Sequence, residues 1–421
     1  MTTRSGQSPL SLDRDAAERF LQGVSAREPV AGLTHAFYRY PARFSPQFAR
    51  ATIEAFTRPG DVVLDPFMGG ATALVEAHTL GRIGIGLDIN ELSCFVARAK
   101  TTPLSDSDIT AVRRWTYTTI PNLSLRRTVK RPGKWIEAGY QRNIGTRQTW
   151  PIRKSLELAL DRISLLGSAP QQTFVRALLL RTGQWALDCR SDVPSAAQFR
   201  ERLTEFLEEM IVGLREYREV IAQSANRALP YGHQDSPLIL NRSAQGIERE
   251  PLIANYGPPK LVLTSPPYPG VHVVYHRWQI RGRRETPAPF WIADTLDGKG
   301  LSYYTFGDRK YPNLKTYFDT ARSTFTSVAR IADRHTLFIQ MVAFSDASWQ
   351  LPEYLKTMRS AGLVEARFPN LANSKDGRIR RVVPNRKWYA DQRGPGGAGQ
   401  EVVLFHKRSA HDLERGQCAT Q

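Results

Sequence analysis

Cysteines are few in this sequence, and long apolar runs are absent. The three cysteines, Cys94, Cys189 and Cys418, form no Cys-x-x-Cys pair, so we expect neither a disulfide framework nor a zinc site. No apolar run approaches the roughly 20 residues that span a bilayer. The first residues, MTTRSGQSPLSL, also lack the apolar core of a signal peptide. These absences predict a cytoplasmic protein that does not associate with a membrane.

Acidic residues are outnumbered by basic ones. The chain has 58 Lys and Arg against 40 Asp and Glu, which gives a formal net charge of +18. An excess of this size usually indicates a polyanionic partner, either nucleic acid or an anionic membrane surface. Because no segment suits a membrane, nucleic acid is the favoured partner. The length of 421 residues and the apolar content of 41% allow one large core or two modest ones.

Strand and helix patterns alternate along much of the chain and predict an α/β fold with a doubly wound sheet. Strands are expected at 61–65, 83–88, 238–241, 261–268, 336–344 and 401–407, and helices at 71–81, 312–332 and 350–361. Helical apolar spacing from about 155 to 225 predicts an insertion that interrupts this sheet domain. We therefore divide the chain into a polar, partly loose segment (1–30), a discontinuous sheet domain (31–104 and 236–410), a basic helical insertion (105–235) and a tail (411–421).

Two glycines follow the first predicted strand in LDPFMGGATA (64–73). Asp65 ends the strand, and Gly69 and Gly70 let the backbone pass close to a ligand before the next helix. Asp88 ends the following strand, where a carboxylate can accept both hydroxyl hydrogens of a ribose. The absence of G-x-G-x-x-G and of a Lys-Ser/Thr pair disfavours nicotinamide cofactors and a Walker-type phosphate loop. An adenosine-containing cofactor is predicted, and a plain strand–turn–helix junction is the alternative.

A second motif lies in LVLTSPPY (261–268). It is typical of a buried strand that stops at two prolines and presents Ser265 and Tyr268 at its carboxyl end. That edge of the sheet is where α/β enzymes place their chemistry. The alternative is a strand-ending proline turn without a function.

Together, DPFMGG and TSPPY resemble the two signatures of the S-adenosylmethionine-dependent DNA amino-methyltransferases, which modify cytosine N4 or adenine N6. The resemblance covers about 31–100 and 236–407 and implies a Rossmann-like class I methyltransferase fold with S-adenosylmethionine as cofactor. The cofactor-binding residues that it implies are His35, Phe37, Tyr40, Asp65, Pro66, Phe67, Gly69, Gly70, Asp88 and Thr264. The catalytic residues that it implies are Ser265, Pro266, Pro267 and Tyr268. Arg242 or Ser243 stands where many relatives carry an acidic residue.

The SPPY residues suit the chemistry of an exocyclic amino group. Its lone pair is delocalised into the base, so acceptors aimed at the two amino hydrogens must localise that pair toward the methyl donor. The Ser265 hydroxyl and the carbonyl near Pro266 can be these acceptors, and Tyr268 can stack on a base flipped out of the duplex. Transfer from a sulfonium needs no metal, and His272 and His276 have no evident carboxylate partner. No metal site is therefore expected.

Basic and aromatic residues alternate in two stretches, 113–154 and 276–284. Such stretches suit contacts to phosphates and stacking on bases. The expected DNA-binding residues are Arg126, Arg127, Lys130, Arg131, Arg277, Arg281, Arg283 and Arg284. A solvated loop is the alternative for the first stretch. A third basic run, 377–389, is equally consistent with a DNA contact and with an exposed, charged β-hairpin.

We predict that the chain transfers a methyl group from S-adenosylmethionine to cytosine N4 in double-stranded DNA, because Ser at the head of SPPY accompanies cytosine more often in the family. The alternatives are adenine N6 of DNA, an amino group of an RNA base, and a non-catalytic DNA-binding subunit that keeps the fold. A restriction endonuclease is a conceivable partner. No pattern in the amino-acid sequence predicts which DNA sequence is recognised or what the oligomeric state is.

Overall fold

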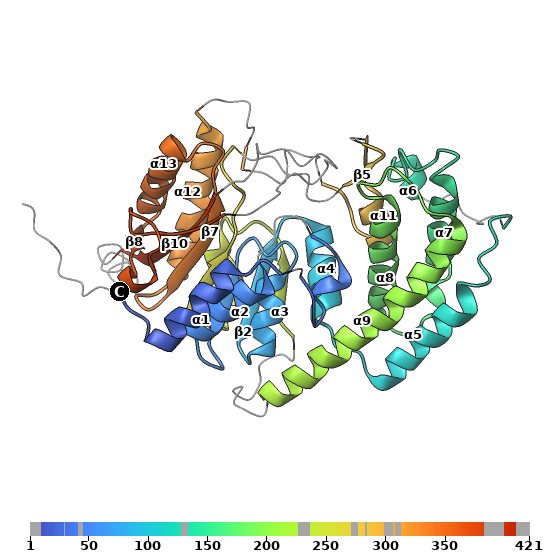
Figure 1. Cartoon of the computed structure of the whole chain (residues 1–421), viewed down its shortest axis with the longest axis horizontal. Helices are drawn as coiled ribbons and strands as arrows, with labels where there is room; N and C mark the ends of the chain where they lie inside the picture. The colour runs from blue at the N-terminus through green and yellow to red at the C-terminus, as the bar shows by residue number, and fades with distance from the viewer. Residues whose placement is uncertain are drawn as a thin grey trace, which may run out of the picture.

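A computed structural model gives the fold in two lobes that lie side by side (Figure 1). The structure describes residues 10–28, 30–40, 45–127, 134–225, 236–270, 277–282, 284–298, 306–307, 313–382 and 400–409. One lobe, the sheet lobe, is built on the central sheet. The other, the helical lobe, contains the insertion. In these ranges no helix combines the length and the apolar character that crossing a membrane requires.

The central sheet has eight strands in the order β3-β2-β1-β4-β7-β10-β8, and β9 pairs with β10 beside this path. The strands are Val62–Asp65 (β1), Ile83–Asp88 (β2), Leu238–Asn241 (β3), Leu261–Thr264 (β4), Leu337–Ala343 (β7), Leu363–Ala366 (β8), Ile379–Val382 (β9) and Gln400–Arg408 (β10). The pairs from β3 through β7 are parallel, whereas β10 is antiparallel to β7, β8 and β9. The predicted doubly wound, mixed α/β sheet of Rossmann-like type is confirmed.

Helices cover both faces of this sheet. They are Arg14–Ser25 (α1), Pro46–Phe56 (α2), Thr72–Thr79 (α3), Glu91–Thr101 (α4), Pro251–Ala254 (α10), Lys315–Arg330 (α12) and Ala347–Ser360 (α13). Val63 packs with residues of α1 to α3 on one face, and Leu64 packs with α12 and α13 on the other. Because successive side chains of a strand point to opposite faces, a strand covered on both sides is continuously apolar. This is why VVLD and LVLT could be recognised as buried strands.

Helix α1 lies within the segment 1–30, which was predicted to be polar and partly loose. Asp13 begins the helix by accepting a hydrogen bond from the Ala16 amide at 2.8 Å. Phe20 is fully buried, with its ring 6.2 Å from that of Phe48 in α2 and 6.1 Å from that of Phe405 in β10. The polar composition conceals an amphipathic helix whose apolar side covers the sheet. Residues 14–25 are therefore packed as a helix, and 1–9 lie outside the described residues.

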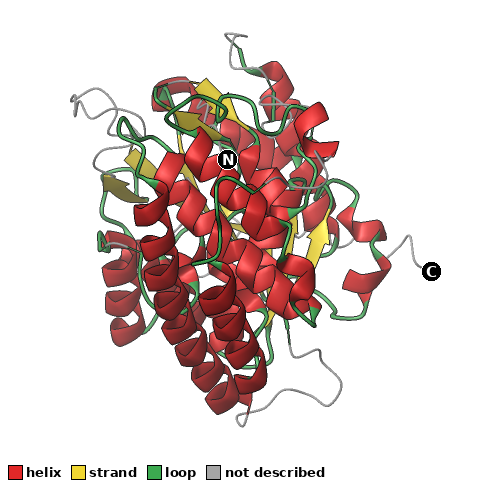
Figure 2. Cartoon of the chain, turned by 90° about the vertical axis from the view of Figure 1, so that its right-hand side faces the viewer, coloured by secondary structure: helices red, strands yellow, loops and turns green. Residues whose placement is uncertain are grey.

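The insertion is helical, as predicted, and forms most of the helical lobe, which faces the viewer in Figure 2. Its helices are Asp106–Thr119 (α5), Lys134–Glu137 (α6), Trp150–Leu160 (α7), Ala169–Leu187 (α8) and Ala196–Ala225 (α9). Leu165, which fits the predicted apolar spacing, lies instead in a short 3-10 turn and is 72% exposed. The core of this lobe continues into the sheet lobe, because Tyr38, Leu92 and Phe95 belong to the same apolar cluster as Leu178.

A segment that follows the SPPY motif also packs in the helical lobe. It contains a two-stranded hairpin, Trp278–Ile280 (β5) with Arg284–Thr286 (β6), and the helix Ala288–Ala293 (α11). Trp278 is buried against α8, where its ring closely approaches Gly183. The Cys189 amide donates to the Gln279 carbonyl at 2.8 Å. Although 278–293 falls within the range predicted for the sheet domain (236–410), these residues are packed against the insertion.

Candidate active site

The glycine turn between β1 and α3 is tied to the end of β2. Asp88 Oδ2 accepts a hydrogen bond from the Gly69 amide at 3.0 Å, and Oδ1 accepts one from the Asn90 amide at 2.9 Å. Desolvation of the carboxyl group raises the pKa of Asp88 to about 6. The Ser93 side chain also hydrogen-bonds to this carboxyl group, and a carboxylate has about four acceptor positions, so room is left for a hydroxyl donor. Asp88 therefore fits an adenosine ribose at this edge.

A buried pair joins the ends of β1 and β4. Thr264 Oγ1 donates to Asp65 Oδ1 at 2.7 Å, and the Phe67 amide donates to the same oxygen at 3.1 Å. Burial raises the pKa of Asp65 to about 7 because it disfavours the charged form. The pair connects the glycine turn directly with the strand that leads into SPPY. The two sequence motifs therefore meet at one point of the sheet edge.

Tyr40 packs against the glycine turn. A Cβ on Gly69 would lie 2.9 Å from Tyr40 Cε1, and a Cβ on Gly70 would lie 2.8 Å from Tyr40 Cβ. Gly69 also has a φ of +44°, which side chains rarely tolerate. The Tyr40 hydroxyl forms a 2.8 Å hydrogen bond with Ser93 Oγ, and Lys100 Nζ donates to the Gly70 carbonyl at 2.8 Å. Both glycines are required by this close approach.

His35 and Phe37 lie in the interior beside the turn. His35 Nε2 is 2.7 Å from Glu76 Oε1 of α3, and both side chains are buried. Arg50 pairs with the second oxygen of Glu76 at 3.3 Å. The Phe37 ring meets Phe174 of α8 edge-on, with centroids 5.7 Å apart. The structure therefore places these two residues between α3 and the helical lobe, and their contact with a cofactor stays a prediction.

The SPPY residues leave the sheet at the carboxyl end of β4 and are held by a chain of hydroxyl groups. Ser265 Oγ donates to the Tyr268 hydroxyl at 2.8 Å, and Tyr268 donates to Glu401 Oε1 of β10 at 3.2 Å. Tyr317 of α12 donates to the Pro267 carbonyl at 2.7 Å. Tyr268 is buried, whereas Ser265 is partly exposed. The turn is thus fixed from two sides, and Ser265 and Pro267 are its partly exposed residues.

Aromatic rings lie beside both motifs. Phe67, which follows the buried Pro66, meets Phe306 with centroids 5.3 Å apart and Phe325 with centroids 5.9 Å apart. Phe306 in turn lies 5.5 Å from Tyr317, the residue that holds the Pro267 carbonyl. The rings are tilted or edge-on to one another and form an apolar cluster, and the face of a single ring of this kind can stack on a base.

Comparison with known proteins agrees with this geometry. Residues 19–98 match a family model described as DNA methylase. The matched segment is similar to the DNA methylase family. This methylase segment runs from α1 into α4 and contains Tyr40, Asp65, both glycines of the turn and Asp88.

Two curated relatives also match the chain. The Type II methyltransferase M.MvaI of Kocuria varians is 41% identical over 80 residues, which are 18% of this chain and 18% of the relative. The Type II methyltransferase M.MjaII of Methanocaldococcus jannaschii is 35% identical over 66 residues, which are 16% of this chain and 12% of the relative. The aligned parts thus span less than a fifth of either relative.

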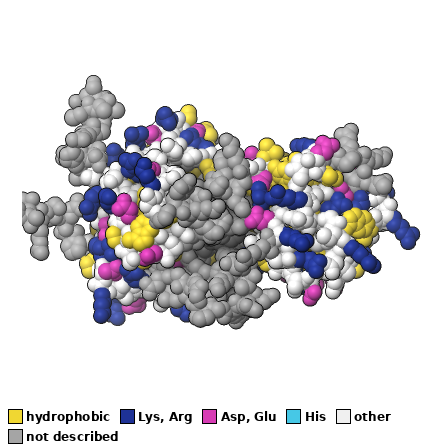
Figure 3. Space-filling view, turned by 90° about the horizontal axis from the view of Figure 1, so that it is seen from above, with side chains coloured by type: hydrophobic (Ala, Val, Ile, Leu, Met, Phe, Trp, Pro, Cys, Tyr) yellow, Lys and Arg dark blue, Asp and Glu magenta, His cyan; other side chains and the backbone are white. Residues whose placement is uncertain are grey.

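The predicted DNA-binding residues divide into exposed and paired ones. Arg126, Arg127, Arg281 and Arg284 are exposed. Arg277 is mostly buried in ion pairs, 2.6 Å from Asp297 and 3.5 Å from Glu285. Lys130, Arg131 and Arg283 lie outside the described residues. Figure 3 shows Lys and Arg side chains over both lobes of the upper face, several of them on the part of the helical lobe nearest the middle of the molecule.

Much of the basic stretch 113–154 supports the helical lobe. Arg113 pairs with Glu208 of α9, and Lys154 pairs with Glu157 at 3.2 Å. Trp115 is buried in the core. A solvated loop is therefore wrong for α5 and α7. In the third basic run, β9 pairs antiparallel with β10, as the hairpin alternative expects, and 383–389 lies outside the described residues.

Neither a metal cluster nor a reactive thiol lies in the described part of the chain. No group of three or more His, Cys, Asp or Glu residues there could hold a metal ion. His272 and His276 fall outside that part. Cys94 and Cys189 are free, and desolvation raises the pKa of both thiols to about 12, so neither is a thiolate at neutral pH.

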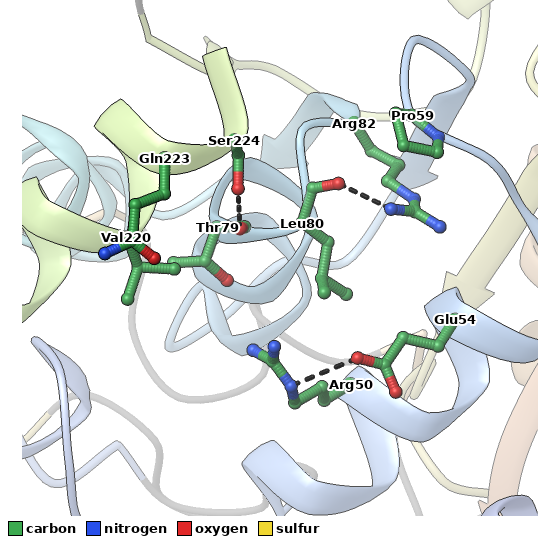
Figure 4. Close-up of a pocket in the computed structure, with 9 residues that line it drawn as sticks. All are labelled: Arg50, Glu54, Pro59, Thr79, Leu80, Arg82, Val220, Gln223 and Ser224. Carbon is green, nitrogen blue, oxygen red and sulfur yellow. Dashed lines mark hydrogen bonds and ion pairs between the residues drawn. The ribbon is translucent and has the colours of Figure 1, made fainter. Parts of the chain in front are cut away.

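A cavity of about 330 Å³ lies at the opposite end of the sheet (Figure 4). It is lined by Arg50, Glu54, Pro59, Thr79, Leu80, Arg82, Val220, Gln223 and Ser224. Arg82 donates to the Thr57 and Leu80 carbonyls, and Ser224 donates to the Thr79 carbonyl at 2.6 Å. Pro59 and Arg82 precede β1 and β2, whereas the motif residues follow their strands. This cavity is therefore remote from the candidate active site.

Some site residues were not predicted from the sequence. Ser93, Lys100, Tyr317 and Glu401 contact the motifs through the tertiary fold. The sequence gives one indication of Glu401, because this acidic residue directly precedes the apolar run VVLF (402–405). No local pattern indicates that Lys100, at the end of α4, points inward.

Proposed function

We propose that this chain transfers a methyl group from S-adenosylmethionine to the exocyclic amino group of a base in double-stranded DNA, with cytosine N4 as the favoured target. The observation that carries the proposal is the hydrogen bond between Asp65 and Thr264 at 2.7 Å. It joins the methylase segment to SPPY, so a methyl donor on the glycine turn and a base at Ser265 would be held by adjoining strands. The relatives, both named methyltransferases, support the same reaction class.

The chain's own residues would bind and orient the two reactants. Asp88 would accept the ribose hydroxyls, and Tyr40 would keep the glycine turn in shape. The cofactor, when bound, supplies an electrophilic methyl group on a sulfonium. Ser265 and the Pro266 carbonyl would accept the two amino hydrogens and so direct the nitrogen lone pair toward that methyl group. The base would leave the stack at a cost of a few kcal/mol, offset by aromatic contacts, for which Tyr268 and Phe67 are candidates.

The exposed arginines favour DNA as the macromolecular partner. Arg126 and Arg127 belong to the insertion, and Arg281 and Arg284 belong to the hairpin packed against it. We assign phosphate contacts to these residues and the recognition of the target sequence to the helical lobe. A cognate restriction endonuclease is the partner suggested by the Type II names of the relatives.

The test is to incubate the purified chain with tritiated S-adenosylmethionine and unmodified genomic DNA, digest the DNA to nucleosides and identify the labelled one by chromatography. Label in N4-methylcytosine is expected. Label in N6-methyladenine would support the same mechanism with adenine as the target base. Label only in RNA supplied in parallel would show that the substrate is a base of RNA. No label in DNA or in RNA would favour a non-catalytic DNA-binding subunit. Ser265→Ala is the matched inactive control.

A further inference from the structure

A line of four polar side chains runs from the sheet to the tip of SPPY. Ser265 donates to Tyr268 at 2.8 Å, Tyr268 donates to Glu401 Oε1 at 3.2 Å, and Arg381 Nε lies 2.9 Å from Glu401 Oε2. Glu401 and Arg381 face each other across the antiparallel pair β10–β9. Tyr268 and Glu401 are 7% and 6% exposed, so solvent has little access to the links between them.

The chemistry of the last member fixes the direction of the whole line. An ionised carboxylate has no hydrogen to donate, so the Tyr268 hydroxyl must give its single hydrogen to Glu401. The Tyr268 oxygen is then an acceptor and takes the single hydrogen of Ser265. Ser265 is left with lone pairs only for any further partner. Arg381 stabilises this arrangement because its positive charge lies beside the second carboxylate oxygen, with 2.9 Å between Nε and Oε2.

We propose that Glu401, held by Arg381, is a positioning residue that makes Ser265 an obligatory hydrogen-bond acceptor toward the substrate. This inference rests on the proposed methyl transfer and specifies its substrate class. A base edge that presents an amino group offers a hydrogen to Ser265, whereas a keto group offers only a second acceptor. The relay therefore selects amino-bearing bases and rejects keto bases of the same shape. Without the carboxylate, the serine hydroxyl can rotate and donate, and that selection weakens.

The experiment compares Glu401→Gln and Tyr268→Phe with the parent chain. Glu401→Gln keeps the shape of the side chain but adds an amide NH2 that can donate to Tyr268, so the direction of the relay is no longer fixed. Tyr268→Phe removes the hydroxyl group that connects Ser265 with Glu401. Single-turnover methyl transfer should slow by between about tenfold and a hundredfold, the range for a lost hydrogen bond to a charged group. The dissociation constant of S-adenosylmethionine should stay within about twofold of the parent, because no cofactor residue is changed. The double variant should be no slower than the slower single variant, since both break one line.

The ratio of two DNA affinities distinguishes a positioning role of Glu401 from a general loss of stability. Duplexes that contain the mapped target site are prepared with the target base and with its keto counterpart, which is uracil for cytosine or hypoxanthine for adenine. The affinity for the amino base is divided by the affinity for the keto base, and this ratio is compared between variants. The two bases differ in how easily they leave the duplex, but this difference is the same for every variant and does not affect the comparison. The preference for the amino base should fall in Glu401→Gln. Glu365→Gln, which removes another arginine-paired carboxylate from the neighbouring strand β8, should leave both rate and ratio unchanged.

Two results would overturn the relay while leaving methyl transfer intact. One is a parent chain that methylates DNA and a Glu401→Gln variant with unchanged rate and ratio. The other is an equal loss in Glu365→Gln, which would show that any paired carboxylate at this edge of the sheet acts through stability alone. If the parent transfers no methyl group to any nucleic acid, the proposed function fails and the relay falls with it.

Discussion

The side-chain amide of Gln184 holds both backbone polar groups of Arg39, 145 residues away in the chain. Gln184 Oε1 accepts from the Arg39 amide at 3.1 Å, and Nε2 donates to the Arg39 carbonyl at 3.0 Å. Gln184 lies in α8, and Arg39 immediately precedes the tyrosine that packs on the glycine turn. The helical lobe therefore helps to position the cofactor side of the site.

Replacing Gln184 with Ala should loosen this connection. Two backbone groups would lose their partners, so the free energy of unfolding should fall by about 1–3 kcal/mol. The affinity for S-adenosylmethionine should fall as well, because Tyr40 would be held less firmly. Urea unfolding and titration calorimetry measure the two effects. Gln223→Ala, at an exposed position of α9, should change stability by less than about 0.5 kcal/mol. A stability loss with unchanged cofactor affinity would argue against the connection.

Gly70→Ala should impair cofactor binding through a clash. The added methyl group would lie 2.8 Å from Tyr40 Cβ, so the tyrosine backbone or the turn must move. We expect a loss of at least tenfold in affinity for S-adenosylmethionine, about 1.4 kcal/mol, measured by calorimetry. Gly145→Ala is the matched control, since its methyl group would meet no atom within 4 Å and its φ is not positive. Equal effects of both changes would contradict this explanation.

The stability of the parent chain should depend on pH through Asp65. Its pKa is raised from 3.8 to about 7 in the folded state, so the folded chain binds this proton more tightly than the unfolded chain. The resulting stabilisation is complete below about pH 4 and is lost as the pH rises through about 7. Asp65→Asn cannot titrate. Its stability relative to the parent should therefore increase by roughly a few kcal/mol between about pH 4 and 8 in urea unfolding. A pH-independent difference would refute the prediction.

Arg277 and Arg281 should respond differently to substitution although they are four residues apart. Arg277→Met would remove the positive charge beside the partly buried Asp297 and Glu285, so the free energy of unfolding should fall by about 3 kcal/mol. Arg281 is exposed. Arg281→Ala should instead weaken DNA binding and reduce the slope of log affinity against log salt by about 1, with little change in stability. Unfolding curves measure the effect on stability, and DNA titrations at several salt concentrations measure the effect on DNA binding. A stability loss in Arg281→Ala together with a purely DNA-binding defect in Arg277→Met would contradict the prediction.

The parts of the site that were predicted from the sequence depend on local patterns. Asp65, Asp88 and Ser265 follow short apolar strands, and parallel strands bring their carboxyl ends to one edge of a sheet. The link from Tyr268 to Glu401 could not be foreseen, because it spans 133 residues and depends on β10 inserting antiparallel between β7 and β8. The ion pairs of Arg277 could not be foreseen for a similar reason. Its charge is visible in the sequence, but its acidic partners meet it only in the folded lobe.

The core shared by Tyr38, Leu92 and Phe95 with the helical lobe limits how this chain can be recombined. A helical lobe taken from another methylase and joined only at the ends of 105–235 would meet foreign side chains on α4 and on the segment before the glycine turn. A working chimera would have to carry these contact positions and the hairpin at 278–286 along with the lobe. Exchange of the segment 105–235 alone would therefore disturb the shared core before it could transfer a property of the helical lobe.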